Sequence, residues 1–206
     1  MRANIYVDAF NVYYGCLKGT SCKWLDYRCA VLSAVPRDEI HRIRYFTARV
    51  RPRLDDPEQP QRQQAYLRAL ETIPHLTVHH GRYLTHKTRM PLARPRPGVK
   101  TVEVIKTEEE GSDVNLASYL LLDTFRKDCE VAIVISNDSD LKEPIELAQN
   151  ELGMTVGVVN PHPASRRSRA LRPTFFKQLR PTTLSACQFP VQMRDARGVI
   201  HKPASW

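Results

Sequence analysis

The chain has 206 residues, of which 42% are hydrophobic and 26% are charged, as in an ordinary soluble globular protein. No stretch approaches the roughly 18 consecutive apolar residues of a membrane helix, and the first residues lack the apolar segment of a signal peptide. These features exclude a membrane protein and predict a cytoplasmic one. The net charge of +9 favours a polyanionic partner without identifying it.

The cysteines are five in number, and no two of them form a CxxC pair. An odd number without such a pair predicts neither a disulfide framework nor a zinc site. We therefore expect free thiols, mostly buried, at Cys16, Cys22, Cys29, Cys129 and Cys187.

Acidic and basic residues are distributed unevenly along the chain. Thirteen of the 22 acids fall between Glu103 and Glu151. Residues 81–100 contain six Lys or Arg and no acid, and residues 152–194 contain seven and no acid. An acidic centre between two basic stretches fits metal-dependent chemistry on a nucleic-acid backbone, although solvated surface faces would produce the same pattern.

The first half of the chain is predicted to begin with a strand and then to alternate helices with strands. An apolar run ending at Asp8 predicts the first strand, and Asp26 can cap a short helix that continues to Val35. The further elements expected here are a strand over residues 40–50, a loop over 51–60, a helix over 61–72, a strand over 76–83 with His79 and His80 on opposite faces, and an exposed irregular loop over 91–98.

The second half continues the alternation of strands with helices. The uninterrupted apolar run Val131 to Ile135 is typical of a strand buried on both faces. Strands and helices in this order predict an α/β fold with a mostly parallel sheet between two helical layers. We expect one domain over residues 1–180 and a C-terminal extension over 181–206 packed on its surface. The other elements are a strand over 100–107, a solvated loop over Glu108, Glu109 and Glu110, a helix from Ser112 to about Lys127 with Val114, Leu116, Ala117, Leu120, Leu121 and Phe125 on its buried side, a helix over 141–152 that Gly153 ends, and a strand over 154–159.

Acidic residues stand where buried strands end or helices begin. In a parallel sheet ligands bind beyond the carboxyl ends of the strands. Asp8 ends the first strand, Asp138 and Asp140 follow the most apolar one, and Asp113 opens a helix. Carboxylates that meet there repel one another unless a cation binds, and oxygen ligands without Cys or His select Mg²⁺ or Mn²⁺. Each of these acids could instead serve only as a turn or capping residue.

Two other features bear on the site. The chain has no GxxxxGK[ST] or GxGxxG sequence, so a glycine loop that cradles a nucleotide is unsupported. Asp123 lies ten residues beyond Asp113, about 80° around the predicted helix. We expect it either to support the site or to lie on the surface.

Three ordered blocks resemble the NYN domain family, a branch of the PIN-like nucleases that includes the LabA-like proteins. The blocks are YVDAFNVYYG over residues 6–15, KTEEEGSDVNLA over 106–117 and SNDSDL over 136–141, and the resemblance spans residues 1–160. It implies a three-layer α/β/α, Rossmann-like (PIN-like) fold and a divalent-metal nuclease site that most often acts on RNA. The acidic ligands that it implies are Asp8, Asp113, Asp138 and Asp140, with Asn11 and Ser136 as polar helpers.

The sequence thus predicts a ribonuclease, in particular an endoribonuclease, that uses Mg²⁺ or Mn²⁺ to hydrolyse RNA and can form a homodimer. A non-catalytic RNA-binding or regulatory module of the same fold is the main alternative, and a phosphatase for small esters is a weaker one. Tyr13 and Tyr14 could stack on an unpaired base, although core packing is the expected role of at least one. The residues expected to hold the RNA backbone are Lys106, Arg89, Arg94, Arg96, Arg166, Arg167 and Arg169.

Overall fold

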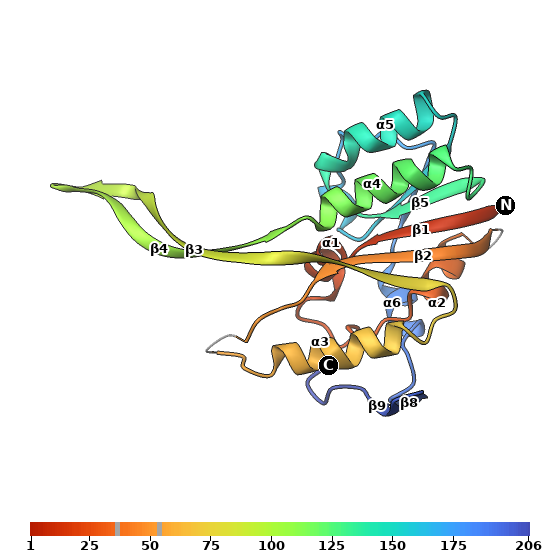
Figure 1. The fold of residues 1–206 in the computed structure, drawn as a ribbon, viewed down its shortest axis with the longest axis horizontal. Coiled ribbons are helices and arrows are strands. Elements are labelled where there is room, and N and C mark those ends of the chain that lie inside the picture. Colours follow the sequence, from red (N-terminus) through yellow and green to blue (C-terminus); the bar gives the residue numbers. More distant parts are fainter. Residues whose placement is uncertain (36–37, 53–54) are drawn as a thin grey trace.

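The computed structural model, which describes residues 1–35, 38–52 and 55–206, contains a central sheet from which a long two-stranded arm projects (Figure 1). The seven strands lie in the order β4-β3-β2-β1-β5-β6-β7. All neighbours pair in parallel except β3 and β4, which pair antiparallel. The strands are β1 (Arg2–Asp8), β2 (Glu39–Ala48), β3 (Leu76–Arg96), β4 (Val99–Glu110), β5 (Val131–Ile135), β6 (Thr155–Asn160) and β7 (Phe175–Gln178).

Helices cover both faces of the sheet, which confirms the predicted three layers (Figure 1). Successive side chains of a strand point to opposite faces, so Ile5 and Val7 of β1 pack in one hydrophobic cluster and Tyr6 in the other. The first cluster includes side chains from α2 (Tyr27–Ala34), α3 (Gln59–Leu70) and α6 (Pro181–Ala186), and the second includes side chains from α4 (Ser112–Phe125) and α5 (Lys142–Asn150). The remaining elements are α1 (Ala9–Val12), the π-helix η1 (Tyr13–Leu17), the 3-10 helices η2 (Ser139–Leu141) and η3 (Ala164–Arg166), and the hairpin strands β8 (Gln192–Asp195) and β9 (Gly198–His201).

Most element boundaries agree with the sequence. Asp26 caps α2 as predicted, because its carboxylate accepts hydrogen bonds from the backbone N–H groups of Arg28 and Cys29. Helix α3 begins at Gln59 rather than at residue 61, since a proline in the first turn loses no helical hydrogen bond. Residues 53–54 of the loop predicted over 51–60 lie outside the described residues.

The arm is the largest departure from the sequence analysis. The prediction of an irregular loop over residues 91–98 is wrong, because β3 continues to Arg96 and Pro91 pairs with Thr101 of β4. The prediction of a solvated loop over residues 108–110 is also wrong, since these residues end β4 and pair with residues 82–84 of β3. Both strands of a two-stranded ribbon are edge strands, in which alternate backbone N–H groups point to solvent. A proline at such a position lacks an N–H group that would not have bonded to the other strand, and it is therefore tolerated.

Helix α4 buries a narrower face than its apolar residues predict. Leu116 and Leu120 are fully buried, but Val114 is 68% exposed and Phe125 is 74% exposed. Asp123 and the neighbouring Thr124 face the sheet instead. The prediction that Val114 and Phe125 lie on the buried side is therefore wrong.

The C-terminal residues contribute to the core. Phe189 packs in the same cluster as Trp24, whose indole Nε1 donates a hydrogen bond to the Pro190 carbonyl at 2.9 Å. Cys29 and Cys187 form a disulfide, so the expectation of free thiols is wrong for these two. The division of the chain at residue 180 stays a prediction. Of the helices in the described ranges, none has the length and apolarity needed to cross a bilayer.

Candidate metal and nucleic-acid site

The candidate site lies where the sheet changes its direction of winding. Strand β1 has β2 on one side and β5 on the other, so the connections from β1 and into β5 run to opposite sides of the sheet. Such a switch point leaves a crevice beyond the carboxyl ends of the two strands. Val7 pairs with Ile135 there, and the next residues, Asp8 and Ser136, meet directly. The Ser136 hydroxyl donates a hydrogen bond to Oδ2 of Asp8 at 2.8 Å.

Asp8 is held at this point by its own backbone and by its neighbours. Its Oδ1 accepts a hydrogen bond from the Asn11 backbone N–H at 2.9 Å, which makes Asp8 the cap of α1. The residue is only 4% exposed. Burial raises the pKa of Asp8 to about 7, and the charges of Asp113 and Asp138 add to the rise against the hydrogen bonds that lower it.

Asp113 reaches the site because the start of α4 is fastened to the end of β4. The Glu109 carboxylate accepts hydrogen bonds from the Ser112 backbone N–H at 3.1 Å and from its hydroxyl at 2.8 Å. Gly81 permits this approach, since a Cβ there would lie 2.9 Å from the Ser112 nitrogen. Burial raises the pKa of Asp113 to about 6, and Asp138 and Glu109 add to the effect.

Asp138 begins the turn after β5 and completes a group of three acids. Its backbone N–H donates to the Ser136 hydroxyl at 3.1 Å, and its Oδ1 accepts from the Asp140 backbone N–H at 3.0 Å. One carboxylate oxygen from each of Asp8, Asp113 and Asp138 lies within 4.8 Å of the other two. Asp140 is exposed and does not belong to this group, although its charge also raises the pKa of Asp113.

The three carboxylates fit a hard divalent cation. They supply only oxygen atoms, which Mg²⁺ and Mn²⁺ prefer. Two of them have raised pKa values, so the site binds protons more tightly than an ordinary pair of exposed acids. A bound cation would replace those protons and remove the repulsion between the carboxylates.

Asn137 is a structural residue of the site to which the sequence analysis assigned no role. Its backbone N–H donates to Oδ1 of Asn11 at 2.9 Å, and its amide Nδ2 donates to the Arg166 carbonyl at 2.9 Å. Its Oδ1 accepts from the Ser168 backbone N–H at 2.8 Å. Asn137 therefore fastens the basic loop over residues 164–169 beside the three acids. Its place directly after a buried strand was the available signal.

His162 is a second residue that the sequence analysis missed. It lies at the edge of the site, just beyond the end of β6. Asn160 accepts from its backbone N–H at 2.9 Å, and Gln178 donates to its carbonyl at 2.7 Å. Gly15 lies against its ring, where a Cβ would be 2.8 Å from Cδ2. His162 follows a buried strand closely, as Asp8 ends one, and this position after β6 was the available signal.

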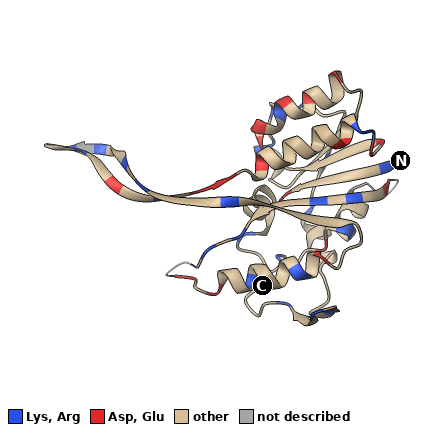
Figure 2. Ribbon diagram, viewed as in Figure 1, with Lys and Arg blue, Asp and Glu red and all other residues tan. Residues whose placement is uncertain are grey.

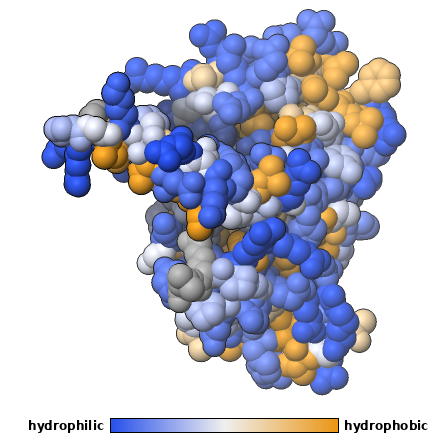
Figure 3. All heavy atoms as spheres, turned by 60° about the vertical axis from the view of Figure 1, so that its left-hand side comes forward, coloured by the Kyte–Doolittle hydropathy of each residue, from blue (hydrophilic) through white to orange (hydrophobic). Residues whose placement is uncertain are grey.

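An open cleft of about 920 Å³ covers the acids. It is walled by Asp8, Asp113 and Asp138 on one side and by the base of the arm on the other, where Tyr83 and Ile105 line it. Figure 3 shows this side of the molecule with the arm turned toward the viewer and mostly hydrophilic side chains over its surface. The cleft is large enough for a chain-like ligand.

The basic residues expected to hold RNA lie in two places. Arg89, Arg94 and Arg96 lie on the outer part of the arm, where Figure 2 shows both Lys or Arg and an acidic residue. The acid is Glu103, which is the strand partner of Arg89. Arg166, Arg167 and Arg169 lie in the loop that Asn137 fastens, although the Arg167 guanidinium is stacked 3.5 Å from the centre of the Phe176 ring. Lys106 pairs with Glu108 at 2.7 Å, so its ammonium group already has an anionic partner.

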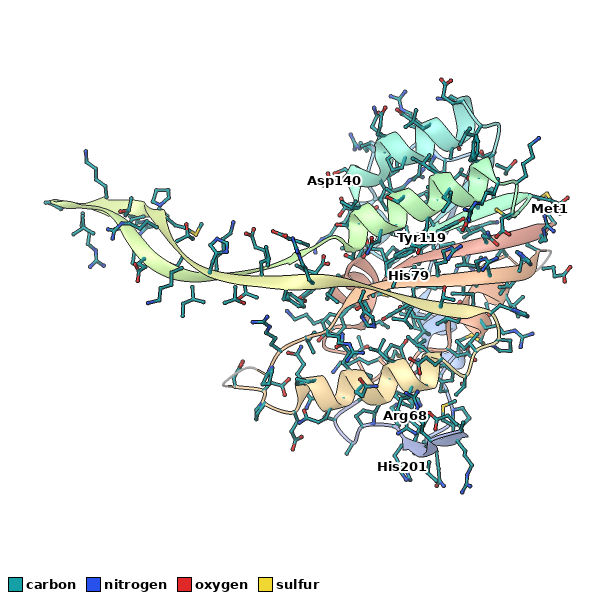
Figure 4. All side chains as sticks on the ribbon, in the orientation of Figure 1. Met1, Arg68, His79, Tyr119, Asp140 and His201 are labelled. Atoms are coloured by element: carbon teal, nitrogen blue, oxygen red, sulfur yellow. A yellow bond between two sulfur atoms is a disulfide. The ribbon has the colours of Figure 1, made fainter. Side chains whose placement is uncertain are left out.

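Asp123 belongs to a different group of residues. It is 2% exposed, and its two carboxylate oxygens accept from the Arg44 guanidinium at 2.7 and 2.8 Å, while the Tyr6 hydroxyl donates at 3.0 Å. The expectation that it supports the site or lies on the surface is therefore wrong. The Arg44 guanidinium carbon lies 4.3 Å from the centre of the Tyr119 ring, which also contacts the His79 ring. Figure 4 labels Tyr119 and His79 over the sheet, and it shows Asp140 at the end of the helices nearest the arm.

Comparisons with known proteins agree with this architecture. The family model described as the NYN domain matches residues 2–179. The chain is 27% identical over 237 aligned residues to 6-hydroxy-3-succinoylpyridine 3-monooxygenase HspA of Pseudomonas putida (strain DSM 28022 / S16), with 100% of this chain and 75% of that protein covered. A solved structure of a protein of unknown function from Vibrio parahaemolyticus superimposes with a TM-score of 0.52 at 19% identity, over 87% of this chain and 93% of the other. That likeness shows the fold alone.

Proposed function

Because the chain belongs to the NYN domain family, we propose that it is a divalent-metal-dependent ribonuclease that hydrolyses phosphodiester bonds within RNA. The observation that supports this proposal best is the group formed by Asp8, Asp113 and Asp138, whose oxygens lie within 4.8 Å of one another at the switch point of the sheet. A family of nuclease-like fold and a site suited to Mg²⁺ or Mn²⁺ favour the same chemistry.

Each residue of the site has a distinct task in this proposal. Asp8, Asp113 and Asp138 hold the ion, which when bound supplies Lewis-acid activation of water and neutralises charge on the phosphodiester. Ser136 and Asn11 orient Asp8 through their hydrogen bonds to its two oxygens. Asp140 is too exposed to be placed with the three and is proposed as an outer acidic residue.

The basic residues would hold the RNA on either side of the acids. Phosphate contacts position a strand without reading its bases. The outer arm supplies Arg89, Arg94 and Arg96, and the loop fastened by Asn137 supplies Arg166 and its neighbours. Because the acids lie between these two basic regions, a strand that bridges them would cross the site. Cytoplasmic location and a homodimer stay predictions.

The test is incubation of end-labelled single-stranded RNA and DNA of one sequence with Mn²⁺, Mg²⁺ or EDTA, followed by mapping of the product ends. We expect internal cuts in RNA with a divalent ion and none in EDTA. RNA that is shifted in a gel but never shortened under any of these ions would instead support the non-catalytic RNA-binding module.

A second candidate follows from the relative named as a 6-hydroxy-3-succinoylpyridine 3-monooxygenase. This chain would then bind a small heteroaromatic acid. An aromatic cavity of about 280 Å³ that adjoins the cleft favours this candidate. Titration with 6-hydroxypyridine-3-carboxylate, followed by quenching of intrinsic fluorescence, tests it, and no change in fluorescence up to millimolar ligand would reject it.

A further inference from the structure

A second cavity continues the cleft away from the acids. It has a volume of about 280 Å³ and lies between the π-helix η1, the start of α3 and the inner end of the arm. The two cavities share Phe10, Tyr14, Gln59 and Tyr83 among their lining residues. A ligand that lies over the acids can therefore extend into the second cavity, which we call the ring pocket.

Seven of the 17 described residues that line the ring pocket are aromatic. Tyr13 and Tyr14 meet edge to face with centroids 5.2 Å apart, and Phe10 meets Tyr83 in the same way at 6.0 Å. Tyr66 closes the inner wall, where its hydroxyl donates to the Leu25 carbonyl at 2.8 Å. Fixed rings around a small cavity favour a flat aromatic ligand, because stacked and edge-to-face contacts suit such a shape.

Gln59 lines both cavities, and one of its polar atoms has no hydrogen-bond partner among the described residues. Its Oε1 is buried within the protein and accepts no hydrogen bond, so a ligand reaches it only when the side chain turns toward the cavity. A buried acceptor without a donor is costly, and a ligand that supplies an N–H would remove that cost. The unpaired acceptor thus points to a ligand that combines a flat ring with an amino group.

We propose that the ring pocket binds one unpaired nucleobase that carries an exocyclic amino group, from an RNA strand whose phosphate lies at the three acids. This proposal rests on the proposed function and adds a base preference to it. Cytosine and adenine present such an amino group, whereas uracil presents a carbonyl oxygen at the corresponding position. Tyr14, which is 55% exposed between the two cavities, stacks on the base.

The surroundings favour a nucleic-acid strand over a small heteroaromatic acid. The ring pocket opens into a cleft more than three times its volume, at about 920 Å³ against 280 Å³. Beyond the cleft the arm carries Lys and Arg residues together with Glu103, and the basic residues are in excess there (Figure 2). A single-ring ligand would leave both regions without contact, whereas a strand with one base in the ring pocket uses all three.

The test is fluorescence anisotropy of labelled C12 and U12 RNA strands with the full chain in Ca²⁺, with strand length checked afterwards so that cleavage is excluded. The wild type is expected to bind C12 about fivefold more tightly than U12, because cytosine offers the Gln59 oxygen an exocyclic amino donor where uracil presents a carbonyl oxygen. Gln59→Met should remove that preference. Tyr14→Ala should weaken binding of both strands about tenfold, while Tyr14→Phe and the exposed aromatic control Phe125→Ala should not.

Three results would overturn the inference. The first is a preference for C12 that persists in Gln59→Met, and the second is binding of both strands by Tyr14→Ala that equals that of the wild type. The third is that neither strand binds while 6-hydroxypyridine-3-carboxylate quenches the fluorescence of the wild type but not that of Tyr14→Ala. Failure of the proposed function is distinguishable, because Mn²⁺-dependent cleavage is measured separately. Cleavage with unaltered binding in the variants refutes the ring pocket alone, and pocket-dependent binding without cleavage refutes the nuclease alone.

Discussion

Toward the amino ends of the strands, which we call the amino edge, Asp123 and Asp128 each have a cation beside them. At the carboxyl edge of the sheet three carboxylates face one another instead. Asp123 is paired with Arg44, and Asp128 with Arg42, at 2.7 and 3.1 Å. Burial raises the pKa of Asp128, but hydrogen bonds from Asn4 and Arg42 outweigh it and bring the pKa to about 2. At the other edge, burial raises the pKa of Asp8 to about 7.

The difference separates acids that stabilise the fold from acids that are kept for a ligand. A paired acid has already exchanged its hydration for a protein cation, and it has nothing further to bind. An acid that accepts hydrogen bonds only from N–H and hydroxyl groups, and that lies beside other acids, has a negative charge that no protein cation neutralises. Such an acid is available to bind a cation. Substitutions at the two edges should therefore change different properties, and each prediction below tests that separation.

The largest effect is expected on activity at the carboxyl edge. Asp138→Asn removes a charge but keeps the oxygen that accepts from Asp140, so the turn should persist. We expect Mn²⁺-dependent cleavage of single-stranded RNA to fall below detection while the circular dichroism spectrum and melting temperature stay close to those of the wild type. Asp128→Asn is the matched control, and it should cleave normally per folded molecule. Equal activity of Asp138→Asn and the wild type would contradict the assigned role.

The next largest effect is expected on stability at the amino edge. Asp123→Asn leaves the buried Arg44 charge without its partner, and breaking such a pair costs about 3 kcal/mol or more of unfolding free energy. Urea unfolding measures this loss. The double variant Arg44→Met with Asp123→Leu should recover much of it, because an apolar pair needs no compensation. A loss below about 1 kcal/mol in Asp123→Asn would show that the pair is not as desolvated as its burial indicates.

How far the sequence predicts each edge depends on the range of the interactions. The carboxyl edge could be predicted because Asp8 and Asp138 directly follow apolar runs that fix the strands, and the sheet then brings strand ends together. The amino edge could not, since Asp123 and Arg44 are 79 residues apart and an acid within an amphipathic helix usually faces solvent. Because apolar residues of such a helix usually face the core, Val114 and Phe125 were expected on the buried side of α4 where Asp123 lies instead.

The arm tests whether the basic residues act with the acids. Arg94→Gln with Arg96→Gln removes two charges from the outer part of the arm, which projects away from the rest of the sheet (Figure 1), so folding should be unaffected. We expect RNA affinity to fall about tenfold and the salt dependence of log K to lessen by about two. Titrations at several salt concentrations measure both. Affinity and salt dependence equal to those of the wild type would show that the arm does not hold RNA.

The outer half of β3 was not predictable from its pattern, although most of β4 was predicted as a strand over residues 100–107. Pro91 and its basic neighbours lack the alternation of apolar and polar residues that marks a strand, and they indicate a loop. The disulfide between Cys29 and Cys187 was not predictable either, because the two residues are 158 positions apart and their spacing matches no known cysteine pattern.

The smallest effect is expected in the pH dependence of stability. The pKa values of Asp8 and Asp113 in the folded protein are raised to about 7 and about 6, so both carboxyl groups bind a proton more tightly when the protein is folded. This tighter binding stabilises the folded state fully below about pH 4. The stabilisation is lost as the pH rises through the two folded pKa values. The melting temperature of the metal-free protein should therefore fall between pH 4 and 7 by a few degrees more in the wild type than in Asp8→Asn. Calorimetry measures the difference, and parallel curves for the two proteins would contradict it.

The most direct measurement is titration of the metal-free protein with Mn²⁺ at pH 7.5, with the free ion followed by its electron paramagnetic resonance signal. We expect the wild type and Asp128→Asn to bind Mn²⁺ alike and remove the free-ion signal, and Asp113→Asn to bind the ion at least about tenfold more weakly. A wild type that leaves the free-ion signal unchanged, or three proteins that bind equally, would contradict the claim that the acids of the carboxyl edge form a cation site.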